Sequence, residues 1–232
     1  VLKEGTETVV DRIFITGVAP ITLDSLTSGF NIGTDITQDI DFNDMMGFTR
    51  DELVGILNNQ EIPIEEQEKI LPIMKENYDG YKFSLNAKNQ IYNSNMCLYF
   101  LSRYIRLGEI PNDLIDMNIA SDYSKIGKML DLCKGENRLE ILRQTVQGEP
   151  IVNNIVKKFN PAIEFTETHM ISMLYYLGYL TISGELVGIP ELIIPNKVMK
   201  EIYADYFMQL VSQMAEFRMN SDTNQEILIQ LA

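Results

Sequence analysis

Residues that bind nucleotide phosphates follow a fixed pattern in many enzymes, and this sequence lacks that pattern. A phosphate-binding loop needs glycines that turn consecutive backbone amides toward the phosphates, together with a lysine that balances their charge. The single Gly-Lys pair, Gly127-Lys128, precedes Met129 and has no glycine at the required upstream position. The sequence therefore predicts that the chain alone neither binds ATP with useful affinity nor hydrolyses a nucleotide.

Metal-dependent chemistry lacks its usual residues as well. No apolar strand ends in paired acids that could hold magnesium, and no lysine has Asp or Glu two residues before it, as one class of nuclease requires. The single histidine, His169, stands among residues at helical core spacing, where a packing role is commoner than that of a base. A lone histidine also argues against a histidine-based zinc site. Cys97 and Cys133 belong to no motif and predict buried free thiols in a reducing compartment.

Two groups of side chains could form a contact surface or a ligand site. Several methionines could mark an adaptable protein-contact surface, although we favour ordinary core filling: Met45, Met46, Met170, Met173, Met208 and Met214. The aromatic residues Tyr78, Tyr81 and Phe83 flank Asp79-Gly80 and could provide a ligand platform. For these we favour packing beneath a turn.

Composition and charge limit the partners of this chain. Of its 232 residues, 45% are hydrophobic and 22% are charged, as in folded soluble proteins. A net charge of −14 disfavours binding to nucleic acid or to anionic lipid. The longest apolar stretch, 170–189, contains Glu185 and three glycines, which argues against a membrane span. We expect a cytoplasmic protein that could have a protein partner.

The N-terminal part predicts an isolated strand. The chain begins at Val1 rather than at a methionine, so we expect a trimmed piece of a longer protein. Residues 9–18 form a short β-branched run typical of a strand, and residues 20–31 are rich in loop-forming residues. A single strand needs partners, which would lie upstream of this chain. The exposed edge of this strand predicts self-association into a homo-oligomer.

A helical region follows. Thr49 and Glu52 have the spacing of a capping box, so a helix is expected from Thr49. A second helix is expected over 65–77, where Pro72 should kink or break it. Ser94 is the expected N-cap of a third helix, which carries Leu98, Leu101, Tyr104 and Ile105 and ends near Gly108. Shorter helices are expected at 123–133 and 136–147, with a junction over 148–161.

The last region has the order helix, hairpin, helix. Thr166 should start a helix with Met170 and Leu174 on one face. The triplets 180–182 and 192–194 flank a glycine-containing turn and predict a hairpin, and another helix should begin at Pro195-Asn196. This order is compatible with a winged-helix-like unit.

These elements predict a mainly α fold with minor β: one residual core strand, a helical bundle and a winged-helix-like C-terminal unit. The expected domains are 1–35 (the last strand and a loop), 36–160 (the helical region), 161–216 (the winged-helix-like region) and 217–232 (a helical lead to a missing segment).

Several sequence blocks, in a fixed order, closely resemble the predicted AAA-ATPase-like family of bacterial proteins. The blocks are RIFITGVAPITLDSLTSGFNIGTDIT, FNDMMGFTRDEL, NYDGYKF, IYNSNMCLYFLSRY, SDYSK, LYYLGYLTI and IPNKVMKEIY, and they span nearly the whole chain. In that family an ATPase core precedes helical segments, and a nuclease-like domain of the PD-(D/E)XK superfamily often follows.

The resemblance implies that this chain is the C-terminal portion of such a protein. ATP and magnesium would then belong to the full-length protein, whose Walker A and Walker B motifs lie upstream. This chain itself would have no cofactor, no metal and no catalytic residue. Thr16, at the end of the 12–16 strand, would occupy the position of a nucleotide sensor, although a threonine at a strand end is also a common structural residue. Relatives place an arginine nearby, where this chain has Ala19-Pro20, which argues against a charged sensor.

Two functional interpretations remain. In the first, nucleotide bound upstream repositions the helical and winged-helix-like parts, so that the full-length protein is an ATP-driven switch. In the second, the helices form a non-enzymatic module that binds a protein partner, and the nucleotide machinery is vestigial. An intact phosphate-binding loop upstream of Val1 would favour the first interpretation.

Overall fold

The computed structural model describes residues 12, 14, 16–17, 34–116, 138–157, 159 and 165–215. Within these residues the fold is mainly α-helical with one small sheet, which confirms the predicted fold class. The elements in chain order are η1 (Ile40–Phe42), α2 (Arg50–Asn59), α3 (Ile64–Tyr78), α4 (Ser94–Leu107), α7 (Arg138–Val146), β1 (Ile151–Val152), α8 (Glu167–Tyr176), β2 (Thr181–Leu186), β3 (Ile189–Ile193) and α9 (Lys197–Ala215).

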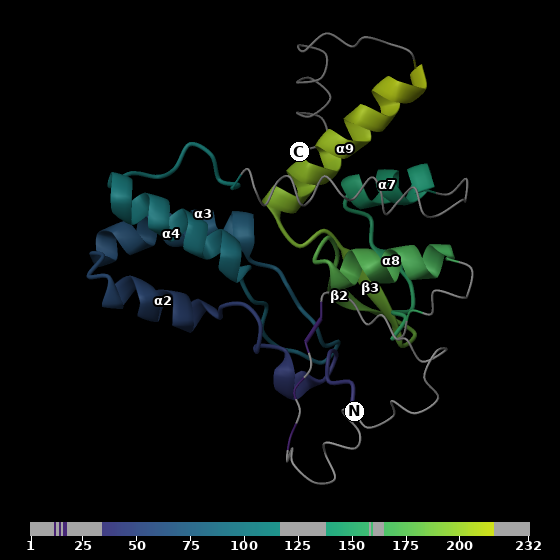
Figure 1. Ribbon diagram of the computed structural model, residues 1–232, viewed down its shortest axis with the longest axis horizontal. Coiled ribbons are helices and arrows are strands. Elements are labelled where there is room, and N and C mark those ends of the chain that lie inside the picture. The colour runs from purple at the N-terminus through teal and green to yellow at the C-terminus, as the bar shows by residue number, and fades with distance from the viewer. Residues whose placement is uncertain are drawn as a thin grey trace.

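The elements form two groups (Figure 1). Helices α2, α3 and α4 lie on one side and are called the helical group. The other side holds α8, the β2–β3 hairpin and α9, which are called the hairpin unit, with α7 packed against α9. Helix α3 also contacts α9, so the two groups touch.

Helix α2 begins as its sequence predicts. The Thr49 hydroxyl oxygen accepts a hydrogen bond from the Glu52 amide at 3.3 Å, and the Glu52 carboxylate accepts one from the Thr49 amide at 2.8 Å. This reciprocal pair satisfies two backbone donors that a helix start otherwise leaves without partners. Leu53 and Leu57 then point into the core with no exposed surface.

The predicted second helix forms, but Pro72 does not break it. Helix α3 continues through Pro72 as far as Tyr78. A proline cannot donate a hydrogen bond to the carbonyl of the residue four positions earlier, here Glu68. Both Pro72 and Glu68 lie on the exposed face of the helix, where water can bind that carbonyl.

Helix α4 forms as predicted but differs from its prediction in its N-cap. Asn93, rather than Ser94, is the N-cap, and its side-chain oxygen accepts from the Met96 amide at 3.2 Å. Gly108 ends the helix in the left-handed region, as expected. The buried face is formed by Met96, Cys97, Phe100, Leu101 and Tyr104. Leu98 and Ile105, two of the apolar residues expected along this helix, are about half exposed.

The hairpin forms as predicted and gains a third strand. The sheet is antiparallel with the order β1-β3-β2. Strand β1 lies within residues 148–161, which were expected to be a connecting segment. It pairs Ile151 with Leu192 of β3. Leu192 also pairs with Ile182 on its other side, and all three side chains are buried. Apolar contact across the three strands therefore fixes the register.

The predicted N-terminal strand is wrong for its described residues. Arg12, Phe14, Thr16 and Gly17 are exposed and belong to no strand. Phe14, in the middle of this run, exposes 59% of its surface. A lone strand cannot satisfy its backbone hydrogen bonds without neighbours, and no described strand pairs with this run. The predicted loop at 20–31, the helix at 123–133 and the segment 217–232 lie outside the described residues.

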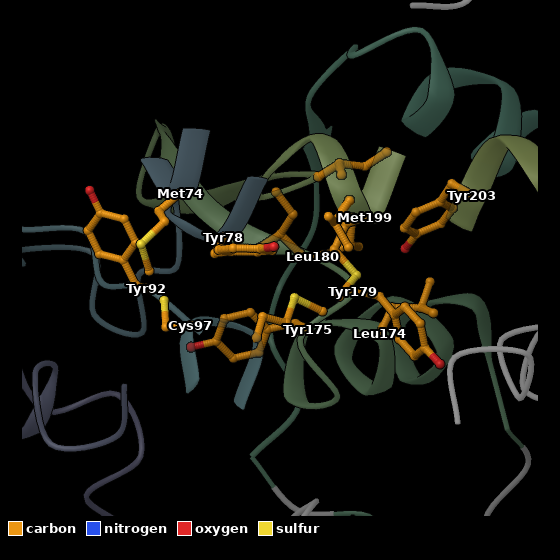
Figure 2. Close-up of a cluster of buried hydrophobic side chains, with 14 of the residues drawn as sticks. Met74, Tyr78, Tyr92, Cys97, Leu174, Tyr175, Tyr179, Leu180, Met199 and Tyr203 are labelled. Carbon is orange, nitrogen blue, oxygen red and sulfur yellow. The ribbon is translucent and has the colours of Figure 1, made fainter. Parts of the chain in front are cut away.

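One continuous hydrophobic core joins the two groups. Figure 2 shows side chains of the helical group, such as Tyr78 and Cys97, in one band with Tyr175 and Met199 of the hairpin unit. Helix α7 matches the predicted helix at 136–147. No helix in the described part of the chain is long and apolar enough to cross a membrane.

Candidate functional site

The turn after α3 is the point where the helical group meets the hairpin unit. Asp79 is the C-cap of α3, and Gly80 follows it with φ +106°, a conformation that favours glycine. A Cβ atom on Gly80 would overlap the carbonyl oxygen of Pro195 and lie 2.9 Å from its carbonyl carbon. Glycine therefore allows the turn to lie directly against Pro195, just before α9.

Hydrogen bonds fix this contact at several positions. Asn196 donates from its side-chain nitrogen to the Asp79 carbonyl at 3.0 Å. Thr181 of β2 accepts from the Lys82 amide at 2.8 Å. Tyr175 of α8 donates its hydroxyl proton to the Phe83 carbonyl at 2.8 Å. Each bond joins segments more than 90 residues apart in the chain. Residues 79–84 and these three partners, together with Pro195, are called the junction.

Asn196 has two roles at once. Besides its bond to the Asp79 carbonyl, its side-chain oxygen accepts from the Met199 amide at 3.1 Å. The second bond caps the N-terminus of α9. The start of α9 is therefore fixed to the end of α3 by one buried side chain.

Asp79 is a half-buried acidic residue of the turn. Burial raises the pKa of its carboxyl group, and the Gly80 amide, Lys75 and the Tyr92 hydroxyl oppose this shift. The Gly80 amide donates to the carboxylate at 2.8 Å. Burial and the neighbouring Asp79 raise the pKa of Tyr92 to about 12. The carboxylate thus has an amide and a hydroxyl as partners, which is a structural arrangement rather than a metal site.

The aromatic residues around this turn pack inward. Tyr78 is fully buried, and its hydroxyl donates to the Leu114 carbonyl at 2.7 Å. Tyr81 is 5% exposed, and its backbone pairs with that of Ile91. Phe83 packs against the core and is partly buried. The favoured interpretation, packing beneath a turn, is confirmed, and these faces are too covered to form a ligand platform.

His169 and Cys97 also have structural roles. The His169 ring nitrogen Nδ1 lies 3.3 Å from the Thr166 amide and 2.6 Å from its hydroxyl, at the start of α8. Its ring packs against Phe159 and Phe165. Cys97 is fully buried and free, and burial raises the pKa of its thiol, which disfavours the reactive thiolate. Cys133 lies outside the described residues.

The remaining sequence candidates do not gather at the junction. Thr16 is exposed, and its role as a nucleotide sensor stays a prediction. Gly127-Lys128 lies outside the described residues. No group of three or more potential metal ligands occurs among the residues that the structure describes.

The methionines divide into two kinds. Met170 and Met208 are buried and Met173 is partly buried, as core filling predicts, whereas the side chain of Met214 lies outside the described part of the chain. Met45 and Met46 are instead 46% and 55% exposed, so the core interpretation is wrong for these two. Sequence reasoning also missed the junction residues Thr181 and Asn196, whose only local signal was the position of Asn196 at an expected helix start.

Comparisons of this chain with protein-family models, with curated proteins and with solved structures found no match. The likeness to the predicted AAA-ATPase-like family therefore rests on the sequence blocks alone. Three of those blocks meet at the junction: NYDGYKF supplies Asp79 to Phe83, LYYLGYLTI supplies Tyr175 and Thr181, and IPNKVMKEIY supplies Asn196.

Proposed function

We propose that this chain is the C-terminal portion of an AAA-ATPase-like protein and that the junction transmits nucleotide-dependent movement from an upstream ATPase core to the hairpin unit. The chain itself has no catalytic role in this proposal. ATP and magnesium are bound upstream, in the cytoplasm, and Thr16 senses the nucleotide.

The observation that carries the proposal is a set of hydrogen bonds between Asn43 and residues 83–84 of the junction. Asn43, in the segment that follows the N-terminal run, accepts from the amides of Phe83 and Ser84 at 2.9 and 3.2 Å. The backbone of Phe48 pairs with that of Tyr92 beside the same turn. A displacement of Asn43 therefore acts on Phe83 and Ser84. Phe83 is bonded to Tyr175 of α8, and the preceding Lys82 is bonded to Thr181 of β2.

The hairpin unit is the output of the switch, and we propose that it is winged-helix-like and contacts protein rather than DNA. The first turns of α9 carry Lys197 and Lys200 but also Glu201 and Asp205. Lys197 also pairs with Glu76 of α3 at 3.4 Å, which lowers its availability to phosphates. With the net charge of −14, these features disfavour a duplex footprint.

Hydrogen–deuterium exchange on the full reading frame tests this proposal. Exchange is measured without nucleotide and with magnesium and a non-hydrolysable ATP analogue, whose binding is verified separately by calorimetry. We expect changed protection in peptides covering 79–84 and 195–199. A protein that binds the analogue but shows the same exchange in both peptides would contradict the proposal, and so would a protein that fails to bind it.

The second interpretation, a protein-binding module, is favoured by a different observation. The exposed apolar residues near Met45 give the chain a contact surface that requires no nucleotide.

A further inference from the structure

Four large apolar side chains are exposed within seven consecutive residues. Ile40, Phe42, Met45 and Met46 expose between 40% and 55% of their surface. Ile40 and Phe42 belong to η1, Met45 and Met46 lie between η1 and α2, and the four residues are called the 40–46 surface. Single exposed hydrophobic residues are ordinary on a protein surface. A cluster of them marks a contact site more often than scattered single residues do.

The backbone of the 40–46 surface is anchored to residues 83–89 by the side chain of Asn43. Asn43, in its middle, is 2% exposed and accepts from the amides of Phe83 and Ser84. Its side-chain nitrogen also donates to the Asn89 carbonyl at 3.3 Å. One buried amide thus connects this turn to three backbone groups about 40 residues away or more.

Gly47 and Asp39 fix the two ends of the surface. Gly47 has φ +124°, and a Cβ atom there would lie 2.7 Å from the Tyr92 carbonyl oxygen. Asp39 caps η1 by accepting from the Asp41 amide at 3.1 Å. The apolar side chains are therefore presented by an ordered turn, and this turn would lose less conformational entropy on binding a partner than a flexible loop would.

Charge indicates what kind of partner fits. Asp39, Asp41 and Asp44 alternate with the apolar side chains and are exposed. In the described part of the chain none of these three carboxylates has an ion pair. Two copies of this surface would place like charges opposite each other, which disfavours a symmetric contact between identical chains. Anionic lipid and nucleic acid are disfavoured for the same reason.

We propose that the 40–46 surface binds a basic amphipathic helix of a partner protein. The apolar face of that helix would cover Ile40, Phe42 and the two methionines, and its Lys or Arg residues would pair with the three aspartates. The unbranched side chains of Met45 and Met46 can adapt to the shape of the incoming residues. This inference does not depend on nucleotide binding.

A synthetic amphipathic helical peptide of leucine and lysine, labelled for fluorescence anisotropy, tests the proposal on the full chain. We expect saturable binding that weakens with added salt. Met45→Ser with Met46→Ser should weaken it by about tenfold or more. Asp41→Asn with Asp44→Asn should weaken it and reduce its dependence on salt.

Matched controls separate this site from general attraction to an acidic protein. Leu98→Ser with Ile105→Ser removes exposed apolar residues of α4, and Glu65→Gln with Glu68→Gln removes exposed charges of α3. Both should bind the peptide as the unmodified chain does, and circular dichroism verifies that all variants fold. Absent binding, or equal weakening by test and control variants, would overturn the proposal. A dimer in light scattering that Met45→Ser with Met46→Ser dissociates would also overturn it, because the occupant would be a second copy.

Discussion

Two constraints meet at Gly80: its positive φ, and its position against the Pro195 carbonyl. An alanine there must adopt a conformation unfavourable to L-residues and must also displace Pro195. We expect Gly80→Ala to lower the free energy of unfolding by about 2–4 kcal/mol. Urea unfolding measures this change.

Gly55 is the matched control for that substitution. It lies inside α2, and an added Cβ atom would have no neighbour within 4 Å. Gly55→Ala should raise the free energy of unfolding by about 0.5–1 kcal/mol, because alanine favours a helix interior. Equal effects of the two substitutions would show that the Gly80 contact is unimportant.

Val187 is a non-glycine residue in a backbone conformation that favours glycine or asparagine. It sits at the tip of the hairpin with φ +53° and 94% of its surface exposed. A β-branched residue is unfavourable in that conformation, and Asn followed by glycine is favoured in such turns. Val187→Asn should therefore raise the free energy of unfolding by about 1 kcal/mol. Leu186→Asn, in the adjoining strand, should not stabilise the chain, and a loss of stability in Val187→Asn would refute the expectation.

Asp79 should make stability depend on pH. Burial raises the pKa of its carboxyl in the folded chain. The folded state then holds a proton more tightly than the unfolded state, so the free energy of unfolding falls as pH rises between the two pKa values. Asp79→Asn keeps an acceptor for the Gly80 amide and should reduce this slope in urea titrations at several acidic to neutral pH values. Glu185→Gln, at an exposed strand position, should leave the slope unchanged; an unchanged slope in Asp79→Asn would contradict the assignment.

Among the elements, α9 depends on Asn196 for both its cap and its attachment. Asn196→Ser keeps a side-chain acceptor for the Met199 amide but is too short to replace the donor to Asp79. Asn196→Ala loses both bonds. We expect costs of about 1 kcal/mol for serine and about 2 kcal/mol for alanine in chemical unfolding. Equal costs would mean that the cap contributes nothing to stability.

Local signals predicted most elements, because their causes are local. The Thr49 capping box and the apolar spacing of α8 specify helices from a few neighbouring residues. The buried face of α4 could not be read from its sequence, because periodicity does not show which apolar stripe another element will cover; Leu101 is buried and Leu98 is exposed. The strand at 9–18 failed for its described residues because a strand requires neighbours that this chain does not pair with it.

The junction could not be predicted from local patterns. Its bonds join residues such as Lys82 and Thr181, which are 99 positions apart, and no periodicity relates them. The sequence blocks NYDGYKF and IPNKVMKEIY marked the segments involved but did not show that they touch. The exposure of Met45 could not be predicted from the sequence either, because methionine is common both in cores and at contact surfaces.

On the scale of the whole molecule, the helical group and the hairpin unit share one hydrophobic core and the bonds of the junction, so we expect them to unfold as one cooperative unit. Helices α3 and α9 contact each other directly at this place, and Lys197 pairs with Glu76 between them. A switch that moves one group must then move the other, which is the central requirement of the proposed coupling.

Native-state hydrogen exchange of the chain, with and without Gly80→Ala, tests this cooperation most directly. The amides of α3 and α9 should share one opening free energy in the unmodified chain, and Gly80→Ala should lower both by the same amount. Gly55→Ala should lower neither. Protection that falls in α3 while that of α9 stays unchanged would show that the two groups open independently, and would contradict the coupling through the junction.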